Sequence, residues 1–236
     1  MLTSRDQLIL QHVGLYTISI RRVIEQQFFA GMDCENVIAR LLVESRIRAN
    51  GGVAGKIGRL PGGISYYQLT PPEADRIGVP HHRTKQLPSA VLPRLISVLW
   101  FCTMTNKKRR RLERYELKNL FGAGTNLGTG LGVPHVLELS GERKAILRVY
   151  TPGHVKDRAY ARSLAIDAER AAEHAGLAPW IRERNYRFVV LVDSPAKQKR
   201  LQHVIERVGV PIEFSVELAP SVQTLHTACK ETQHSE

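Results

Sequence analysis

The hydrophobic period of the chain changes once within its first 70 residues, and this change limits how the N-terminal part can fold. Three stretches with apolar residues at helical spacing begin in turn at Thr3 or Ser4, near Ser19, and after Asp33. Polar and apolar residues then alternate over 46–49, and a second strand is expected over Ile64–Leu69 after a glycine-rich segment. This order of elements predicts a winged helix–turn–helix over residues 1–85.

The third predicted helix, Cys34–Glu44, has the width that fits the DNA major groove, and the basic loop behind it can follow phosphates. Asn and Arg side chains pair with adenine and guanine edges. The candidate DNA-binding residues of this domain are therefore Asn36, Arg40, Arg46, Arg48, Lys56 and Arg59. A winged helix also serves protein contact or dimerisation, and Glu35 and Glu44 keep that alternative open because they make the helix less basic.

Positive charge is concentrated in the middle of the chain. The net charge of +12 favours a polyanionic partner, and half of the excess lies in 86–122, where we predict a helical basic linker. Five consecutive cations there are expected to stay outside any core and to bind DNA phosphates, with a solvated basic turn as the alternative. These five residues are Lys107, Lys108, Arg109, Arg110 and Arg111.

Cysteine usage and hydropathy exclude other classes of protein. The three cysteines are far apart and lack CxxC spacing, so neither a disulfide framework nor a zinc site is expected. The longest apolar stretch, Ala90–Met104, is interrupted by Pro93 and Arg94 and is too short to cross a bilayer. The amphipathic N-terminus contains Asp6, unlike a signal peptide. We therefore expect a cytoplasmic protein without membrane contact.

Residues 123–220 show a different alternation of elements. The expected strands and helices are Val136–Leu139, Ala145–Tyr150, the helix 156–175, Tyr186–Val192, a helix up to Val208, and Pro211–Leu218. This ββαβαβ order predicts an α/β domain that resembles a restriction-endonuclease-like core. The remaining residues, 221–236, are expected to form a polar tail.

Nucleases of that fold need paired carboxylates, which hold the divalent metal that activates water. The second strand of this chain instead reads Leu147-Arg148-Val149-Tyr150, so a cation stands where a carboxylate is needed. We therefore predict no catalytic residue, no metal site and no cofactor, and we assign the domain to association. A metal-dependent DNA nuclease is the alternative, since Glu138 could pair with Asp157 in a displaced site.

Three features give the chain a resemblance to the replication–relaxation family of plasmid and mobile-element proteins. They are Thr3-x-x-Asp6-x-x-x-Leu10 with Tyr16 and Phe28-Phe29, the segment Tyr66-Tyr67-Gln68-Leu69-Thr70, and the hairpin followed by FVVLVDSPAK. The resemblance implies a winged helix followed by a degenerate nuclease-like domain. It implies a protein that binds double-stranded DNA and controls replication or transcription of a plasmid or mobile element. Its expected partners are DNA, a second copy of the chain or a replication protein.

Overall fold

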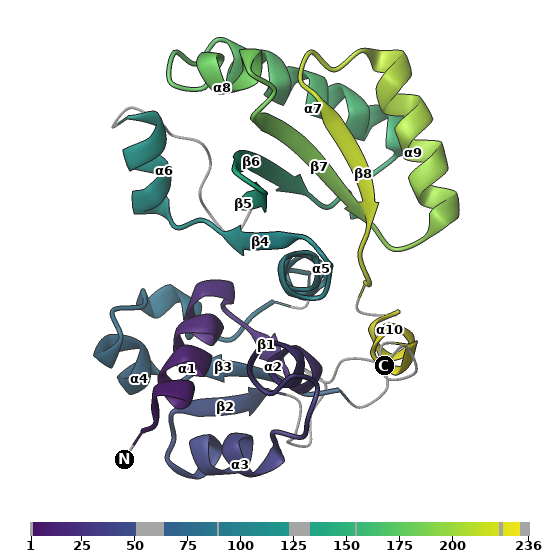
Figure 1. Ribbon diagram of the computed structural model, residues 1–236. Helices are drawn as coiled ribbons and strands as arrows, with labels where there is room; N and C mark the ends of the chain where they lie inside the picture. The colour runs from purple at the N-terminus through teal and green to yellow at the C-terminus, as the bar shows by residue number, and fades with distance from the viewer. Residues whose placement is uncertain are drawn as a thin grey trace. The chain divides into compact units, whose positions relative to one another are not determined.

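The chain forms two compact units (Figure 1). The first unit combines Met1–Met104 with Pro220–Glu236, and the second comprises Thr105–Ala219. The computed structural model describes residues 2–50, 64–88, 90–122, 133–153, 155–221 and 224–231. The stretch 86–122, predicted as a linker, is not a separate segment, because it is divided between the two units at Met104.

The first unit combines helices with a small antiparallel sheet. Its helical segments are α1 (Ser4–Tyr16), α2 (Arg21–Phe28), α3 (Glu35–Val43), α4 (Pro71–Arg76), the 3-10 turn η2 (His81–Arg83), α5 (Leu92–Thr103) and α10 (Leu225–Glu231). Its strands are β1 (Ser19–Ile20), β2 (Ile47–Asn50) and β3 (Tyr66–Leu69), paired in the order β1–β3–β2. Ile9, Leu10, Ile24 and Leu41 are fully buried where the helices pack together.

The sequence prediction of a helix from Ser19 is wrong at its first two residues. Ser19 and Ile20 form β1 and pair with Tyr67 and Tyr66 of β3, and α2 begins only at Arg21. Ile20 is extended and provides no side-chain cap for α2. Pairing with β3 therefore overrides the helical pattern, which continues through these two residues.

Two hydrogen bonds join the later segments of the first unit to its beginning and to its end. Gln27 of α2 donates to the backbone carbonyl of Thr103 in α5 at 2.6 Å. Ser97 of α5 donates to the carbonyl of Pro220 at 3.1 Å, and Leu225 of α10 is fully buried. Among the residues that the structure describes, no helix has the length and apolar character that crossing a membrane requires.

The second unit is built on a five-stranded mixed sheet. Its elements are β4 (Lys108–Arg111), α6 (Arg114–Phe121), β5 (His135–Ser140), β6 (Arg143–Tyr150), α7 (Asp157–Ala172), α8 (Ala178–Arg182), β7 (Tyr186–Val192), α9 (Pro195–Val208) and β8 (Phe214–Leu218). The strand order is β4–β5–β6–β7–β8. The pairs β4–β5 and β5–β6 are antiparallel, whereas β6–β7 and β7–β8 are parallel. The mixed α and β content predicted for the chain is thus confirmed.

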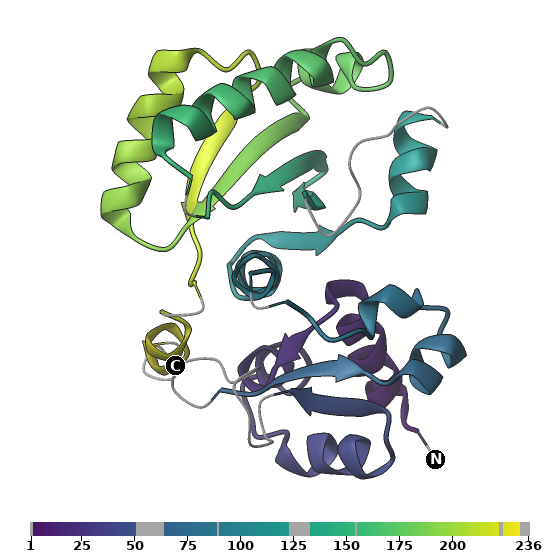
Figure 2. The same ribbon diagram turned by 180° about the vertical axis from the view of Figure 1, so that it is seen from behind.

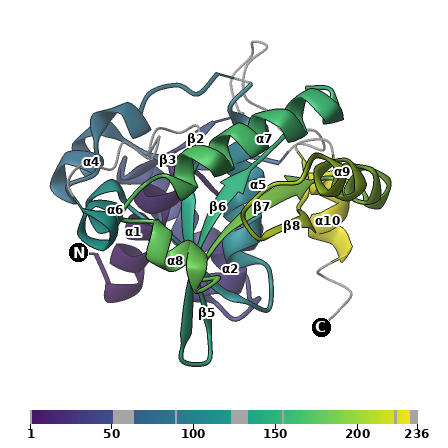
Figure 3. The same ribbon diagram turned by 90° about the horizontal axis from the view of Figure 1, so that it is seen from above.

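Helices α7 and α9 lie on the same face of this sheet (Figures 1 and 2). Leu164 of α7 and Leu201 of α9 share an apolar core with Phe188 and Val190 of β7. The turn between β5 and β6 extends beyond the part of β6 that pairs with β7 (Figure 3). Strand β4 and the short helix α8 were not expected in this domain, so the observed unit is larger than the predicted ββαβαβ order.

One buried histidine lies on the covered face of the sheet. The Nε2 atom of His135 is 3.1 Å from the hydroxyl of Tyr186, and the residue is almost completely buried. Burial, together with the Arg148 guanidinium on the neighbouring strand, lowers the pKa of His135 to about 3. The folded second unit therefore disfavours protonation of this ring.

Acidification is expected to destabilise the second unit through His135. In the unfolded chain the pKa of His135 is about 6.5. As the pH falls below this value, the ring is protonated in the unfolded state but remains neutral in the folded state. Between about pH 7.5 and about pH 5, this difference removes about 2 kcal/mol from the free energy of unfolding. Urea unfolding followed by Trp180 fluorescence in a Trp100→Phe background measures it, because Trp180 is then the remaining tryptophan and lies in the second unit.

His135→Asn removes the titrating ring. Over the same pH interval its free energy of unfolding should therefore fall by about 2 kcal/mol less than that of the parent. A pH dependence identical to that of the parent would show that His135 does not cause the loss.

Candidate nucleic-acid interface

Helix α3 presents a small polar and apolar face to solvent. Asn36, Ala39 and Val43 are exposed, and Val43 is 86% exposed, whereas Ile38 and Leu41 are buried. The backbone N–H of Glu35 donates to Asp33 at 3.0 Å, although the N-cap residue of α3 is Cys34, whose side chain makes no capping hydrogen bond. Asn36, chosen from the sequence as a base-contacting residue, therefore lies accessible near the start of α3.

The acidic side chains at the start of α3 are paired with a cation. Arg21 of α2 lies 2.5 Å from Asp33 and 3.5 Å from Glu35. The Arg21 side chain also donates to Glu25 at 2.7 Å. The two carboxylates that reduce the positive charge of α3 are thus partly neutralised by a neighbouring helix.

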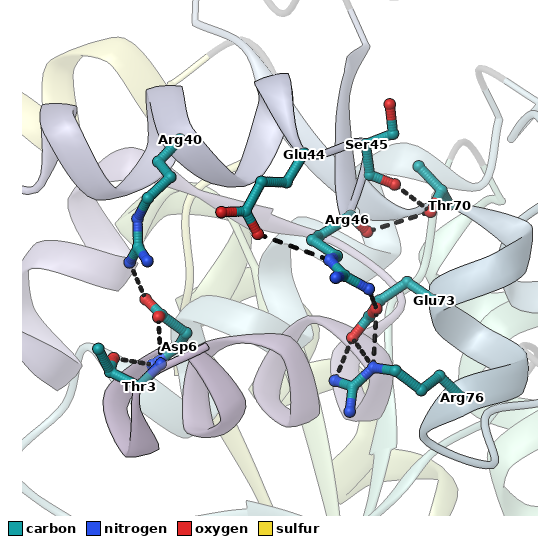
Figure 4. Close-up of polar contacts among 9 residues, drawn as sticks. All are labelled: Thr3, Asp6, Arg40, Glu44, Ser45, Arg46, Thr70, Glu73 and Arg76. Carbon is teal, nitrogen blue, oxygen red and sulfur yellow. Dashed lines mark hydrogen bonds and ion pairs between the residues drawn. The ribbon is translucent and has the colours of Figure 1, made fainter. Parts of the chain in front are cut away.

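Arg40 is held by a buried carboxylate (Figure 4). Its Nη2 atom donates to Oδ1 of Asp6 in α1 at 2.6 Å. The Arg40 side chain remains 36% exposed, whereas that of Asp6 is only 1% exposed. The contact joins α1 to α3 and leaves the cation as the solvent-facing member of the pair.

Asp6 has a second task at the start of α1. Its Oδ2 atom accepts from the backbone N–H of Thr3 at 2.6 Å, and its own backbone N–H donates to the Thr3 hydroxyl, which completes a capping box. Burial raises the pKa of Asp6, but the hydrogen bonds from Thr3 and Arg40 outweigh it, so the pKa lies below its usual range. Asp6 therefore stays ionised at neutral pH and keeps Arg40 in place.

A second buried carboxylate, Glu73 of α4, holds two arginines (Figure 4). Arg46 donates to Glu73 Oε2 at 3.0 Å, and the Nε atom of Arg76 donates to the same oxygen at 2.9 Å. Arg46 lies also 3.6 Å from Glu44. Like Arg40, Arg46 is 36% exposed beside a carboxylate that is 1% exposed. Arg40 and Arg46, both predicted from the sequence to bind DNA, are thus each held by a buried carboxylate of the same unit.

Arg48, in contrast, forms its hydrogen bonds within the first unit. Its guanidinium donates to the backbone carbonyl of Thr84 and to the side-chain oxygen of Gln68 at 3.4 Å. Gln68, which is fully buried in β3, donates to the carbonyls of Arg83 and Lys85. These bonds fix the segment after α4 against the sheet, so Arg48 is occupied inside the unit. The predicted loop cations, Lys56 and Arg59, lie outside the residues that the structure describes.

The run Lys107–Arg111 does not stay outside the fold, contrary to the sequence prediction. Residues 108–111 form β4, an edge strand in which exposed and buried side chains alternate. Arg109, with a side chain that is 1% exposed, donates to Glu138 at 2.7 Å and to both oxygens of Glu217 at 3.0 Å. Arg111 is also buried.

Two of the three exposed residues of this run, Arg110 and Lys107, also lie close to carboxylates. Arg110 makes two hydrogen bonds to Glu116, at 2.7 and 3.0 Å. Lys107 lies 3.5 Å from Glu217 and 3.8 Å from Glu138, and Lys108 is exposed. The charge pattern misled the prediction because the carboxylates that make β4 possible come from β5 and β8. All four residues of β4 are cations, so the sequence shows no alternation that could have revealed the strand.

The two carboxylates considered for a displaced metal site, Glu138 and Asp157, form ion pairs with two different arginines. Glu138 pairs with Arg109, and Asp157 at the start of α7 pairs with Arg200 of α9. Arg148 lies 3.4 Å from Asp167, which also accepts a hydrogen bond from the hydroxyl of Tyr150. Within the described ranges, no three His, Cys, Asp or Glu side chains are grouped as metal ligands.

Comparison of the chain with protein-family models, with curated proteins and with solved structures finds no match.

Removal of Arg109 is expected to destabilise the second unit strongly. Arg109→Ala removes the buried cation shared by Glu138 and Glu217 and leaves them with the exposed Lys107, and loss of one partner of a buried ion pair costs about 3 kcal/mol or more. Lys108→Ala, an exposed change on the same strand, should cost less than about 0.5 kcal/mol. Urea unfolding followed by Trp180 fluorescence in the Trp100→Phe background compares the two variants.

The double variant Arg109→Ala with Glu217→Gln should recover part of the lost stability, because one of the two facing charges is gone. Equal unfolding free energies for Arg109→Ala and Lys108→Ala would contradict the assignment of Arg109 as a buried link between strands.

Proposed function

We propose that the first unit binds double-stranded DNA as a winged helix–turn–helix, with α3 in the major groove. The observation that carries the proposal is a pair of arginines that are 36% exposed, Arg40 in α3 and Arg46 shortly after it, each anchored by a carboxylate that is buried behind it. The net charge of +12 supports an anionic partner. The order α1, β1, α2, α3, β2, β3, in which three helices are followed by the antiparallel pair β2–β3, supports this docking mode.

Anchored arginines suit phosphate binding for two reasons. A guanidinium has five N–H donors, so an arginine that uses some of them internally keeps others for a phosphate. A side chain that is already held in place loses less conformational entropy when it binds, which favours affinity. Asp6 and Glu73 are screened from solvent, so an approaching phosphate meets the cation first.

The proposal gives different tasks to the residues of this face. Arg40 and Arg46 are assigned to phosphates, since Asp6 and Glu73 hold them in place while both side chains remain 36% exposed (Figure 4). Asn36, exposed on α3, reads a base edge, with adenine as the preferred partner of an amide. Ala39 and Val43, exposed on the same helix, are suited to contact with thymine methyl groups.

On the resemblance described for the sequence, the proposed biological role is control of replication or transcription of a plasmid or mobile element. The second unit then serves association with a second copy or a replication protein. The nuclease alternative gains no support from Glu138 and Asp157, because each of them is engaged by an arginine.

Two substitutions should separate base reading from phosphate contact. On a duplex selected from a random pool, Asn36→Ala should cost about 1–3 kcal/mol in binding free energy and leave scrambled DNA unaffected. Arg40→Ala should weaken binding to all sequences alike and reduce the salt slope by about 1. Fluorescence anisotropy over a series of salt concentrations measures both effects. The proposal fails if the unmodified protein binds no duplex, or if its affinity is independent of salt.

A third substitution tests whether the anchor matters. In Asp6→Asn the amide offers one acceptor oxygen for two donors, the Thr3 N–H and Arg40. Removal of a negative charge alone would strengthen DNA binding. We expect instead a loss of about threefold, because Arg40 is no longer held. Asp75→Asn, an exposed substitution with the same change of charge, is the matched control and should show no loss.

Thermal unfolding followed by circular dichroism shows whether the Asp6→Asn variant is folded at the temperature of the binding measurement. DNA binding by folded Asp6→Asn that is as tight as binding by Asp75→Asn, or tighter, would show that anchoring of Arg40 has no role.

A further inference from the structure

Most of the positive charge belongs to the second unit, which does not contain α3. Residues 105–219 hold 21 Lys and Arg against 13 Asp and Glu, a net charge of +8 out of +12 for the chain. Among the cations of the sheet, Arg109 and Arg148 are paired with carboxylates and mostly buried, whereas Lys108, Arg110, Arg143 and Lys144 are exposed. Exposed cations of the helices add to this accessible charge.

Five cations, one directly before α7 and four in the first two turns of α7 and α9, form what we call the α7–α9 basic surface. They are Lys156, Arg158, Arg162, Lys199 and Arg200. All five are exposed. Segments 156–162 and 193–200 together hold six Lys and Arg against two acidic residues, Asp157 and Asp193, which leaves a net charge of +4.

Direct contacts place the two helix starts next to each other. Arg200 of α9 forms an ion pair with Asp157, the first residue of α7. Lys197 of α9 donates to the backbone carbonyl of Gly153, before α7, at 3.3 Å. The two helices follow the parallel strands β6 and β7, so they begin at the same edge of the sheet and cover the same face (Figure 2).

Most of this surface is not neutralised inside the protein. Asp157 is engaged by Arg200 and is only partly exposed. Within the described part of the chain, Lys156, Arg158, Arg162 and Lys199 have no ion-pair partner. The positive ends of the two helix dipoles add to the same potential. Four unpaired cations around two adjacent helix starts match the repeated charges of a nucleic-acid backbone better than a single small anion.

We propose that the α7–α9 basic surface binds the phosphates of duplex DNA without regard to sequence. The inference rests on the proposed DNA binding by the first unit and adds a second contact region in the same chain. In the run Lys107–Arg111, by contrast, Arg109 and Arg110 are paired with carboxylates. Two tethered contacts raise the overall affinity, because the second one forms at a high effective concentration.

The test is a fourfold variant of the full chain in which Lys156, Arg158, Arg162 and Lys199 are changed to Gln. Its matched control changes Arg143, Lys144, Arg182 and Arg184 to Gln, which are exposed cations of the same unit on β6, on α8 and directly after α8. The fourfold variant should bind selected and scrambled duplexes about tenfold more weakly, with the salt slope reduced by about 3–4. The control variant should keep most of the affinity and the slope.

The outcomes separate this inference from the proposed function. If the unmodified protein binds no duplex, both fail. If it binds and the fourfold variant matches the control in affinity and salt slope, the inference fails while DNA binding by the first unit stands. If the fourfold variant loses binding to vesicles of phosphatidylserine and phosphatidylcholine but keeps its DNA affinity, the surface is assigned to lipid and the inference is overturned. Thermal unfolding of both variants serves as the check on folding.

Discussion

The carboxylate of Asp6 fixes α1 and α3 to each other, and the exposed face of the first unit depends on that contact. One of its oxygens caps α1, and the other holds Arg40. A carboxylate can be buried at acceptable cost only when hydrogen bonds satisfy it, and Asp6 meets that condition with a backbone and a side-chain donor. Because both donors converge on one group, the direction of Arg40 is set by the start of another helix.

Glu73 repeats this arrangement between β2 and α4. It accepts hydrogen bonds from Arg46 and Arg76 while lying almost completely out of contact with water. In both places an acidic residue that lowers the formal charge of the unit also determines where a cation points. Formal charge is therefore a poor guide to which side chains meet a ligand, and the same reasoning applies to Arg109 and Arg110 in the run 107–111, which are paired with carboxylates.

Local pattern was sufficient for much of the fold but not for its non-local parts. The apolar spacing of α1 and α3 could be read from neighbouring residues. Strand β1 has two residues, too few to show a period, and it exists because β3 is there to pair with it. Strand β4 needs Glu138 and Glu217, which are about 30 and about 110 residues away in the sequence, and no local rule connects them.

The candidate site was predictable to the same extent. The outward positions of Asn36 and Arg40 follow from helical spacing in α3, so both could be chosen from the sequence. The partners of Arg40, Arg46 and Arg48 lie on other elements, and they decide which arginine is anchored at the surface and which is used inside. The α7–α9 basic surface could not be predicted from the sequence, because its cations belong to two separate segments that only the parallel sheet brings together.

The division of the chain also has a consequence for its synthesis. Residues 220–231 belong to the first unit, where Pro220 accepts a hydrogen bond from α5 and Leu225 is fully buried. The ribosome therefore completes all of 105–219 before it supplies the last part of the first unit. The usual sequence, in which the N-terminal unit of a nascent protein folds first, is reversed at this step. Until α10 emerges, the surface that it covers is open to chaperones, so the N-terminal unit is the last to reach its finished form.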